Sequence, residues 1–491
     1  MPVNHRPRRP GARRTGPRAT LTAHLALLAF LATASCVNQY PNSVFTRFTE
    51  FNRDIAYLFD ILIWLGTAVF VFVEAVLLYA LIRYRRRRGA PEPKQVHGNT
   101  TLEILWTIIP AVVLVFIAVP TVRTIFRTQA RPRPGALEVT VIGHQWWWEF
   151  RYPQFTAPSQ TTAPGYAGRI DTLVTANELY VPLGRTVNFT LRSSNVVHSF
   201  WVPQLAGKRD LIPNRRNYIW FTPDSVEANA WNGFCAEYCG ASHANMRFRA
   251  FTVAPQDFDA WTRHQLSPAV FNPGPPTPRP GGPAIPPLPP LTGANAPINA
   301  PTSPDTARRP LGAQGPPTAG GAARSPVATG PAAARGQPPG GQTIGAAGGL
   351  PYTGFPRERL PEHAVPRTPL PRGIAFQDNL VGDATRGARL FAGGTGACIG
   401  CHAVRGVPTA LGVIGPNLTH FGGRTTLAAA YYPNEPRYLA RWIKNARAMK
   451  PGVVMPALGR NEYDPVTKQR LTAGLDDQQI ADLVAYLQSL K

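Results

Sequence analysis

Residues 235–246 read Cys235-Ala-Glu-Tyr-Cys239-Gly-Ala-Ser-His243-Ala-Asn-Met246, and this segment decides how the chain is interpreted. It holds two thiols, an imidazole and a thioether, and a further histidine, His198, lies 37 residues before Cys235. Thiolate, imidazole and thioether ligands together favour copper over hard cations. A zinc site would leave Met246 without a role. A disulfide between Cys235 and Cys239, which an oxidising compartment would permit, would leave both histidines without a role. The segment therefore predicts a copper site.

A second motif reads Cys398-Ile-Gly-Cys401-His402. This is the spacing of c-type haem attachment, in which two thiols add to the haem vinyl groups and the next histidine ligates the iron. Alone, the spacing is also compatible with a redox-active dithiol. Met455 stands 53 residues beyond His402 and offers a thioether as the second axial ligand, which raises the reduction potential of a haem. The motif predicts one covalently bound haem c.

The first 35 residues have the layout of a secretory signal peptide. An arginine-rich start without acids is followed by a mostly apolar stretch that ends at Ser35-Cys36. The residues before Cys36 loosely resemble a bacterial lipoprotein cleavage box, so Cys36 is a candidate for lipidation, against an unmodified cysteine near a cleavage site. Either way, we expect the mature N-terminus to lie outside the cell membrane.

Two long apolar runs predict a pair of transmembrane helices, at about 55–82 and 102–126. The basic residues at 83 and 85–88 follow the first run, and by the positive-inside bias they face the cytoplasm. The second span then returns the chain to the outer face. The formal net charge of +24 would suit a nucleic-acid partner, but its arginines lie mostly in flanks and linkers, so we expect no nucleic acid.

Composition and periodicity divide the chain into five parts. Short strand-like runs between about 137 and 258 predict a β-sandwich or barrel, a Pro/Gly/Ala-rich stretch predicts a disordered linker, and helical periodicity returns near the C-terminus. The expected boundaries are 1–35 for the signal peptide, 36–131 for the helix hairpin, 132–262 for the β domain, 263–373 for the linker and 374–491 for a small all-α domain.

Residues 40–262 resemble subunit II of cytochrome c oxidase, the subunit that carries the CuA centre. The family pattern C-x-E-x-C-x3-H-x2-M matches residues 235–246, and the earlier V-x-H-S-F matches Val196–Phe200. The resemblance implies a cupredoxin-like Greek-key β-barrel with a dinuclear copper site. It also implies that the thiolates of Cys235 and Cys239 bridge the coppers, that His198 and His243 bind one copper each, that Met246 is a weak axial ligand and that Glu237 contributes its backbone carbonyl.

The same resemblance assigns three further roles, each with an ordinary alternative. Trp146, in Gly143-His-Gln-Trp-Trp-Trp-Glu-Phe150, aligns with the tryptophan that receives electrons from cytochrome c, although a row of tryptophans can simply pack a core. The Glu237 side chain would reach a magnesium ion shared with the catalytic subunit, or else be a solvated loop acid. Glu103 matches a glutamate at the mouth of a proton path, or else is an acid favoured at a helix start.

Residues 375–491 resemble small bacterial class I cytochromes c, whose P-G-x2-M-P ligand loop matches the residues around Met455 and favours it over Met449. Together the two resemblances describe a subunit II with a fused cytochrome c, as in caa-type oxidases. They imply a bacterial inner-membrane protein that passes electrons from haem c to CuA and on to a catalytic subunit I, with a subunit III and an external donor to haem c as further partners. The alternatives are the copper-bearing subunit of a nitric oxide reductase and a membrane-tethered electron carrier.

Overall fold

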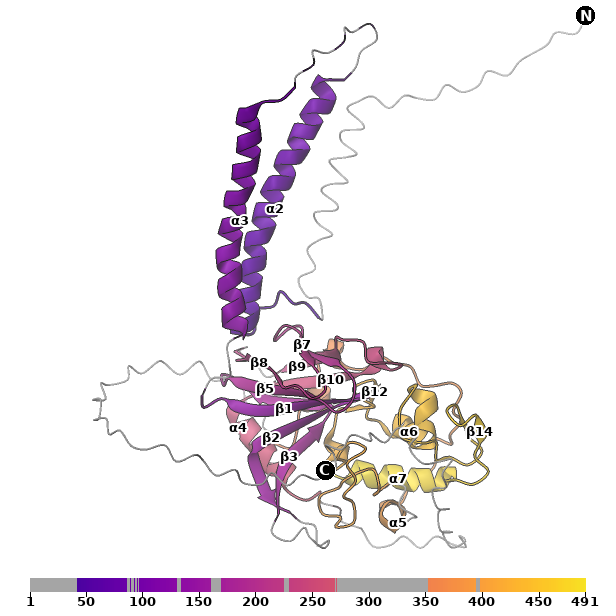
Figure 1. The fold of residues 1–491 in the computed structure, drawn as a ribbon. Helices are drawn as coiled ribbons and strands as arrows, with labels where there is room; N and C mark the ends of the chain where they lie inside the picture. Colours follow the sequence, from indigo (N-terminus) through magenta and orange to yellow (C-terminus); the bar gives the residue numbers. More distant parts are fainter. Residues whose placement is uncertain are drawn as a thin grey trace, which may run out of the picture. The chain divides into compact units, whose positions relative to one another are not determined.

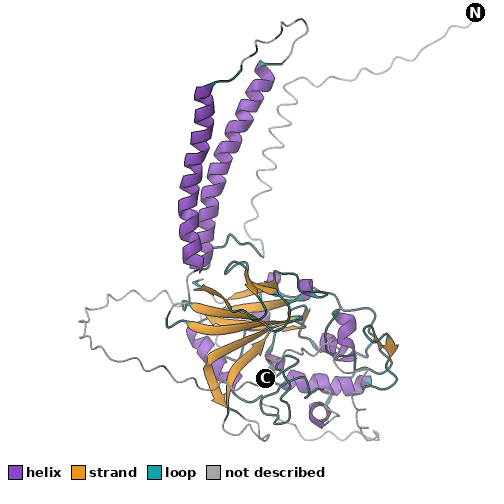
Figure 2. Ribbon diagram, viewed as in Figure 1, coloured by secondary structure: helices purple, strands orange, loops and turns teal. Residues whose placement is uncertain are grey.

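The computed structural model describes residues 42–85, 89, 92, 95, 97–129, 134–159, 169–224, 229–269, 271, 352–393 and 398–491 (Figure 1). Along the chain, two long helices precede a β-sheet domain and then a small helical domain (Figure 2). This order confirms the predicted fold class. The expected signal peptide and Cys36 lie outside the described residues.

Helices α2 (Glu50–Arg83) and α3 (Thr100–Gln129) contain the two predicted spans. At 1.5 Å per residue they are roughly 50 and 45 Å long, enough to cross a bilayer. Most of their large apolar side chains are exposed, and α3 buries no residue at all. Such helices are stable only where lipid or another protein covers them. Thr49 precedes α2 as its N-cap, and its hydroxyl accepts a hydrogen bond from the Asn52 amide at 3.1 Å.

The β domain consists of two five-stranded sheets that share one apolar core. The first sheet has the order β3-β2-β1-β5-β8 and the second β4-β10-β9-β6-β7. The strands are β1 (Leu137–His144), β2 (Trp147–Pro158), β3 (Ile170–Ala176), β4 (Glu178–Pro182), β5 (Val187–Ser193), β6 (His198–Trp201), β7 (Arg209–Leu211), β8 (Asn217–Phe221), β9 (Asn229–Cys235) and β10 (Arg247–Val253).

Alternating burial in β1 explains why this sequence forms a half-buried strand. Leu137, Val139 and Val141 are fully buried, while the residues between them are partly exposed. Aromatic rings fill the space between the sheets: Phe248 lies 5.4 Å from Trp148 and 5.1 Å from another phenylalanine, centroid to centroid. The close packing of these rings fixes the ends of the strands, where the candidate copper residues stand.

The ends of the predicted linker carry defined structure. Helix α4 (Pro255–Leu266) buries Phe258 and Trp261 against the β domain. Residues 352–365, which we call the strap, lie inside the segment that composition assigns to the linker, yet they pack on β4, β9 and β10. Phe355 stacks on Phe251 at 5.0 Å, and the guanidinium of Arg249 donates to the Ala364 carbonyl at 2.7 Å. A proline-rich composition hides such packing because the strap's apolar residues are few.

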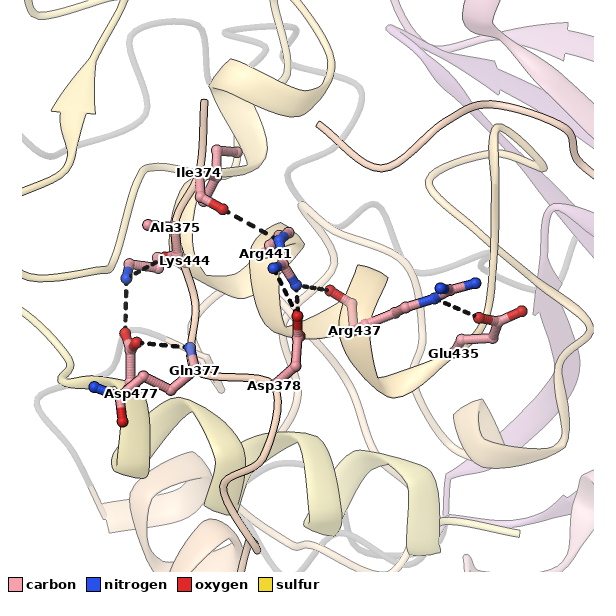
Figure 3. Close-up of polar contacts among 9 residues, drawn as sticks. All are labelled: Ile374, Ala375, Gln377, Asp378, Glu435, Arg437, Arg441, Lys444 and Asp477. Carbon is pink, nitrogen blue, oxygen red and sulfur yellow. Dashed lines mark hydrogen bonds and ion pairs between the residues drawn. The ribbon is translucent and has the colours of Figure 1, made fainter. Parts of the chain in front are cut away.

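The C-terminal domain is built on helices α5 (Ala384–Gly393), α6 (Pro436–Met449) and α7 (Asp477–Ser489), with α5 packed on α7. Figure 3 shows how polar contacts bind the segment before α5 to α6 and α7. Arg441 on α6 makes two hydrogen bonds to Asp378, and Lys444 pairs with Asp477 at 2.7 Å. These contacts fix α6 against the chain that precedes α5.

One ion pair in this domain is almost completely removed from solvent. Arg447, at the end of α6, pairs with Asp464 at 2.6 Å, with side-chain exposures of 2% and 1%. The same guanidinium donates to the Val454 carbonyl at 3.2 Å, directly before the predicted haem ligand Met455. The pair therefore ties residues 450–455, which we call the methionine segment, to α6.

We expect Asp464→Asn to lower the thermal unfolding midpoint of the C-terminal domain, because it leaves the buried Arg447 guanidinium without a counter-charge. Removing one partner of such a pair costs about 3–5 kcal/mol. Thermal unfolding of the solubilised protein, followed by haem absorption, measures the effect. Glu435→Gln is the matched control, since its ion pair with Arg437 is exposed and exposed pairs contribute at most about 1 kcal/mol. Equal midpoints for the two variants would contradict the prediction.

Candidate copper and haem sites

The copper candidates lie in the loop between β9 and β10 and on the neighbouring strand β6. Cys235 ends β9, and its amide donates to the Met246 carbonyl at 3.0 Å, which closes the loop. The two thiol sulfurs lie 3.7 Å apart. This is far beyond the roughly 2.0 Å of a disulfide bond, and both cysteines are free. The arrangement leaves both sulfurs available as ligands.

Each sulfur faces one histidine. The Cys235 sulfur lies 3.8 Å from Nδ1 of His198, and the Cys239 sulfur lies 3.6 Å from Nδ1 of His243. The Met246 thioether lies 3.8 Å from the Cys239 sulfur. The ligand atoms of His198, Cys235 and Cys239 all fall within 4.8 Å of one another. The backbone carbonyl of Glu237 accepts from the Cys235 thiol at 3.2 Å, so each of the other predicted copper residues contacts the sulfur of Cys235 or of Cys239.

The orientation of His198 is set by a residue for which the sequence predicted no such role. Its Nε2 lies 3.2 Å from the side-chain oxygen of Asn195. An Nε2–H donated to that oxygen leaves Nδ1 free to face the Cys235 sulfur. Gly143 makes room for the ring, because a Cβ there would lie 2.7 Å from the imidazole. The only feature of the sequence that could have indicated this contact is that Asn195 stands three residues before His198.

Hydrogen bonding within the thiol pair makes the two sulfurs unequal. The contact with Cys239 is the main cause that lowers the pKa of Cys235, while the same contact, together with burial, raises the pKa of Cys239. Cys235 is therefore the more acidic of the two thiols. A thiolate is the form of cysteine that binds metals.

The predicted electron-receiving residue Trp146 lies in the turn between β1 and β2. Its indole N–H donates to the Cys239 carbonyl at 2.9 Å, and the Gln145 amide donates to the same oxygen at 2.8 Å. Trp148 is fully buried and behaves as a core residue. Trp147 stacks on His144 at 4.1 Å. The indoles of Trp146 and Trp148 both donate to the backbone of residues 235–246, which we call the copper loop, Trp146 at the Cys239 carbonyl and Trp148 at the Met246 carbonyl at 3.4 Å.

The haem candidates line a single cavity in the C-terminal domain. Cys398, Cys401, His402 and Met455 all contribute to its wall. Met449 instead packs in the apolar core of this domain with 4% of its surface exposed. The cavity continues beyond the cytochrome domain, and its wall includes Gln145, Trp146, Trp147, Ala176 and Asn177 from the β domain.

The histidine of the haem motif is held in a ligand-ready state. Its Nδ1 lies 2.8 Å from the Pro416 carbonyl, so an Nδ1–H donated there leaves Nε2 free for iron. A Cβ on Gly415 would lie 2.5 Å from the ring, so only glycine allows this placement. Burial lowers the pKa of His402 and keeps the imidazole neutral. The sequence shows Gly415 and Pro416 shortly after the haem motif, but it does not reveal the hydrogen bond between His402 and the Pro416 carbonyl.

The two thiols of the haem motif lie in surroundings that disfavour their thiolate forms. Burial raises the pKa of Cys398 to about 12 and also raises the pKa of Cys401. Catalytic dithiols have thiols with lowered pKa values. Together with His402 and Met455 in the same wall, these residues fit a covalently attached haem.

Two predicted acidic side chains are exposed. Glu103 lies in the first turn of α3, and Glu237 lies within the copper loop, where its side chain faces solvent while its carbonyl contacts Cys235. Both are free to meet another subunit. The candidate lipidation site Cys36 lies outside the described residues.

Comparison with known families matches three segments of this chain. Residues 49–124 match the transmembrane domain of cytochrome c oxidase subunit II, residues 137–252 match its periplasmic domain, and residues 384–491 match the cytochrome c family. The periplasmic domain of subunit II from Bradyrhizobium japonicum is 28% identical, with a TM-score of 0.22, and the match covers 27% of this chain and 94% of that structure.

Curated relatives agree with these matches. Cytochrome c oxidase subunit 2 of Alkalihalophilus pseudofirmus is 29% identical over 86% of this chain and 83% of its own length. The subunit 2 of Bacillus subtilis is 34% identical over 38% of this chain, and the match spans about half of that relative, 52%. The subunit 2 of Arabidopsis thaliana is 32% identical over 41% of this chain and 80% of its own length. The chain therefore belongs to the cytochrome c oxidase subunit II family and carries a cytochrome c domain at its C-terminus.

Proposed function

We propose that this chain is the electron-input subunit of a terminal cytochrome c oxidase, in which electrons pass from its own haem c to a dinuclear CuA centre and on to catalytic subunit I. One observation carries the proposal. Trp146 lines the haem cavity and also donates its indole N–H to the carbonyl of Cys239 in the copper loop. A single side chain thus touches both candidate redox sites.

The six residues of the copper site would hold two copper ions. The sulfurs of Cys235 and Cys239 are close enough to share both ions, and each faces one imidazole. A dinuclear copper centre held by these residues would supply one-electron transfer with little change in geometry on reduction. The buried Met246 and the closed loop keep the donors in place while the charge changes.

The cytochrome residues would hold one haem c. Cys398 and Cys401 would form the thioether links, while His402 and Met455 would be the iron ligands. Pro416 fixes the tautomer of His402 through its carbonyl. Arg424 also lines the cavity and can neutralise a haem carboxylate.

Oxygen chemistry belongs to another chain. Neither α2 nor α3 contains a histidine that could ligate a haem within the membrane. We propose subunit I and subunit III as partners along the exposed apolar faces of both helices, in a bacterial inner membrane. The exposed Glu237 would contribute to a magnesium ion at the subunit I boundary, and Glu103 to the mouth of a proton path.

The test is to isolate the membrane complex through a tag on this chain and supply electrons from an artificial donor. Rapid oxygen consumption with little nitric oxide consumption supports the proposal. Preferential nitric oxide turnover would assign the chain to a nitric oxide reductase. The absence of both activities in a metal-replete complex would indicate a free-standing electron carrier.

We expect Cys239→Ser to abolish the copper absorption and the copper electron paramagnetic resonance signal while leaving the haem spectrum intact. The change removes one bridging thiolate but no residue of the haem cavity wall. Tyr238→Phe is the control, because Tyr238 lies in the same loop with 76% of its surface exposed. Loss of the haem signal together with the copper signal would contradict the independence of the two sites.

Met455→Leu should remove the methionine-to-iron charge-transfer band and lower the reduction potential of the haem, since leucine offers no thioether. Met449→Leu is the matched control. Met449 lies in the apolar core, and leucine has a similar volume, so the core should tolerate the change. The charge-transfer band should stay unchanged. An unchanged band in Met455→Leu would refute the ligand assignment.

A further inference from the structure

The indole of Trp146 lies between two glycines that belong to different domains. A Cβ on Gly240, next to Cys239 in the copper loop, would lie 3.0 Å from the ring. A Cβ on Gly452, three residues before Met455, would lie 2.5 Å from two ring carbons. Both glycines have positive φ, +107° and +81°, a conformation that L side chains rarely adopt. The methionine segment thus approaches the indole more closely than a side chain at position 452 would permit.

A buried lysine lies beside this contact. Lys450 has 1% of its surface exposed, and its ammonium group donates to the Trp146 carbonyl at 2.8 Å and to the Ala428 carbonyl at 3.1 Å. Within the described part of the chain, no carboxylate makes an ion pair with it. Burial lowers the pKa of Lys450 to about 7. A buried lysine is rarely tolerated without a specific partner. The carbonyls of Trp146 and Ala428 are the partners of Lys450.

Other contacts fix the orientation of the two domains. The Ser242 hydroxyl donates to the Pro451 carbonyl, which joins the copper loop to the methionine segment a second time. On β4, the buried carboxylate of Glu178 accepts from the amide and the hydroxyl of Thr425 at 2.7 and 2.6 Å. Arg405 pairs with Asp171 on β3 at 3.3 Å. Polar groups buried in this specific way disfavour alternative orientations.

We propose that residues 450–452 form a docking site for Trp146, so that the cytochrome domain donates electrons from one docked position and not while diffusing on its linker. The inference rests on the proposed function and identifies its intramolecular partner surface. In the transfer, one electron leaves the reduced haem and is taken up by the oxidised copper pair, and no bond breaks. Because the docked domain covers Trp146, an external donor has to reduce haem c first.

Two variants of the complete complex test the docking site. Lys450→Met removes both hydrogen bonds at similar length, and Gly452→Asn introduces a side chain against the indole while tolerating positive φ better than other residues. We expect each to reduce the docked population about tenfold or more, the equivalent of about 1.4 kcal/mol. Lys468→Met, at an exposed lysine of the same domain, is the control and should change nothing.

Two measurements are needed. Amide hydrogen exchange around Trp146 and Lys450 reports docking, and photochemical reduction of haem c followed by copper absorption reports the transfer rate. In both variants, amide exchange should become faster and the transfer of electrons to copper slower. An unchanged methionine-to-iron band shows that the ligand loop is intact. Exchange and rates equal to those of the unmodified protein in both variants would overturn the docking site. Protected amides without any haem-to-copper transfer in the unmodified protein would support the docking site and refute the proposed function.

Discussion

The hydrogen bond from the Cys235 amide to the Met246 carbonyl closes the copper loop, and the rest of the site depends on that closure. It continues the antiparallel pairing of β9 and β10, so the loop starts and ends on a rigid sheet. Both thiols and the thioether are buried inside the closed loop. Their positions are therefore determined before a metal arrives, which is the condition for a site that changes little on reduction.

Closure also explains why residues from distant parts of the sequence meet there. Strand β6 pairs with β9 at Phe200 and Cys235, which carries His198 to the first thiol. The turn between β1 and β2 reaches the second thiol through Trp146. Sheet pairing thus supplies the rigid framework, and loops at the strand ends supply the chemistry, as is usual for sites on β-sandwiches.

The features that could be predicted from the sequence are those whose residues lie close together along the chain. The candidate copper ligands lie mostly within 12 residues, the candidate haem cysteines and histidine within five, and the two long apolar helices in two apolar runs. These patterns depend on local spacing and hydropathy alone. The contact of Asn195 with His198 depends on backbone geometry, and that of Lys450 with Trp146 joins residues 304 positions apart. The packed strap was missed because its composition resembles that of the linker, while its partners lie on strands more than 100 residues earlier.

Both ends of the segment between the β domain and the cytochrome domain are anchored on folded structure. Phe271 packs edge-on against Tyr486 at 5.2 Å, and Tyr352 is buried with the core of the β domain. Contacts elsewhere join the same two domains, between Glu178 and Thr425 and between Asp171 and Arg405. The position of the C-terminal domain on the β domain therefore depends on packing at several separate points and not on the contact at Trp146 alone.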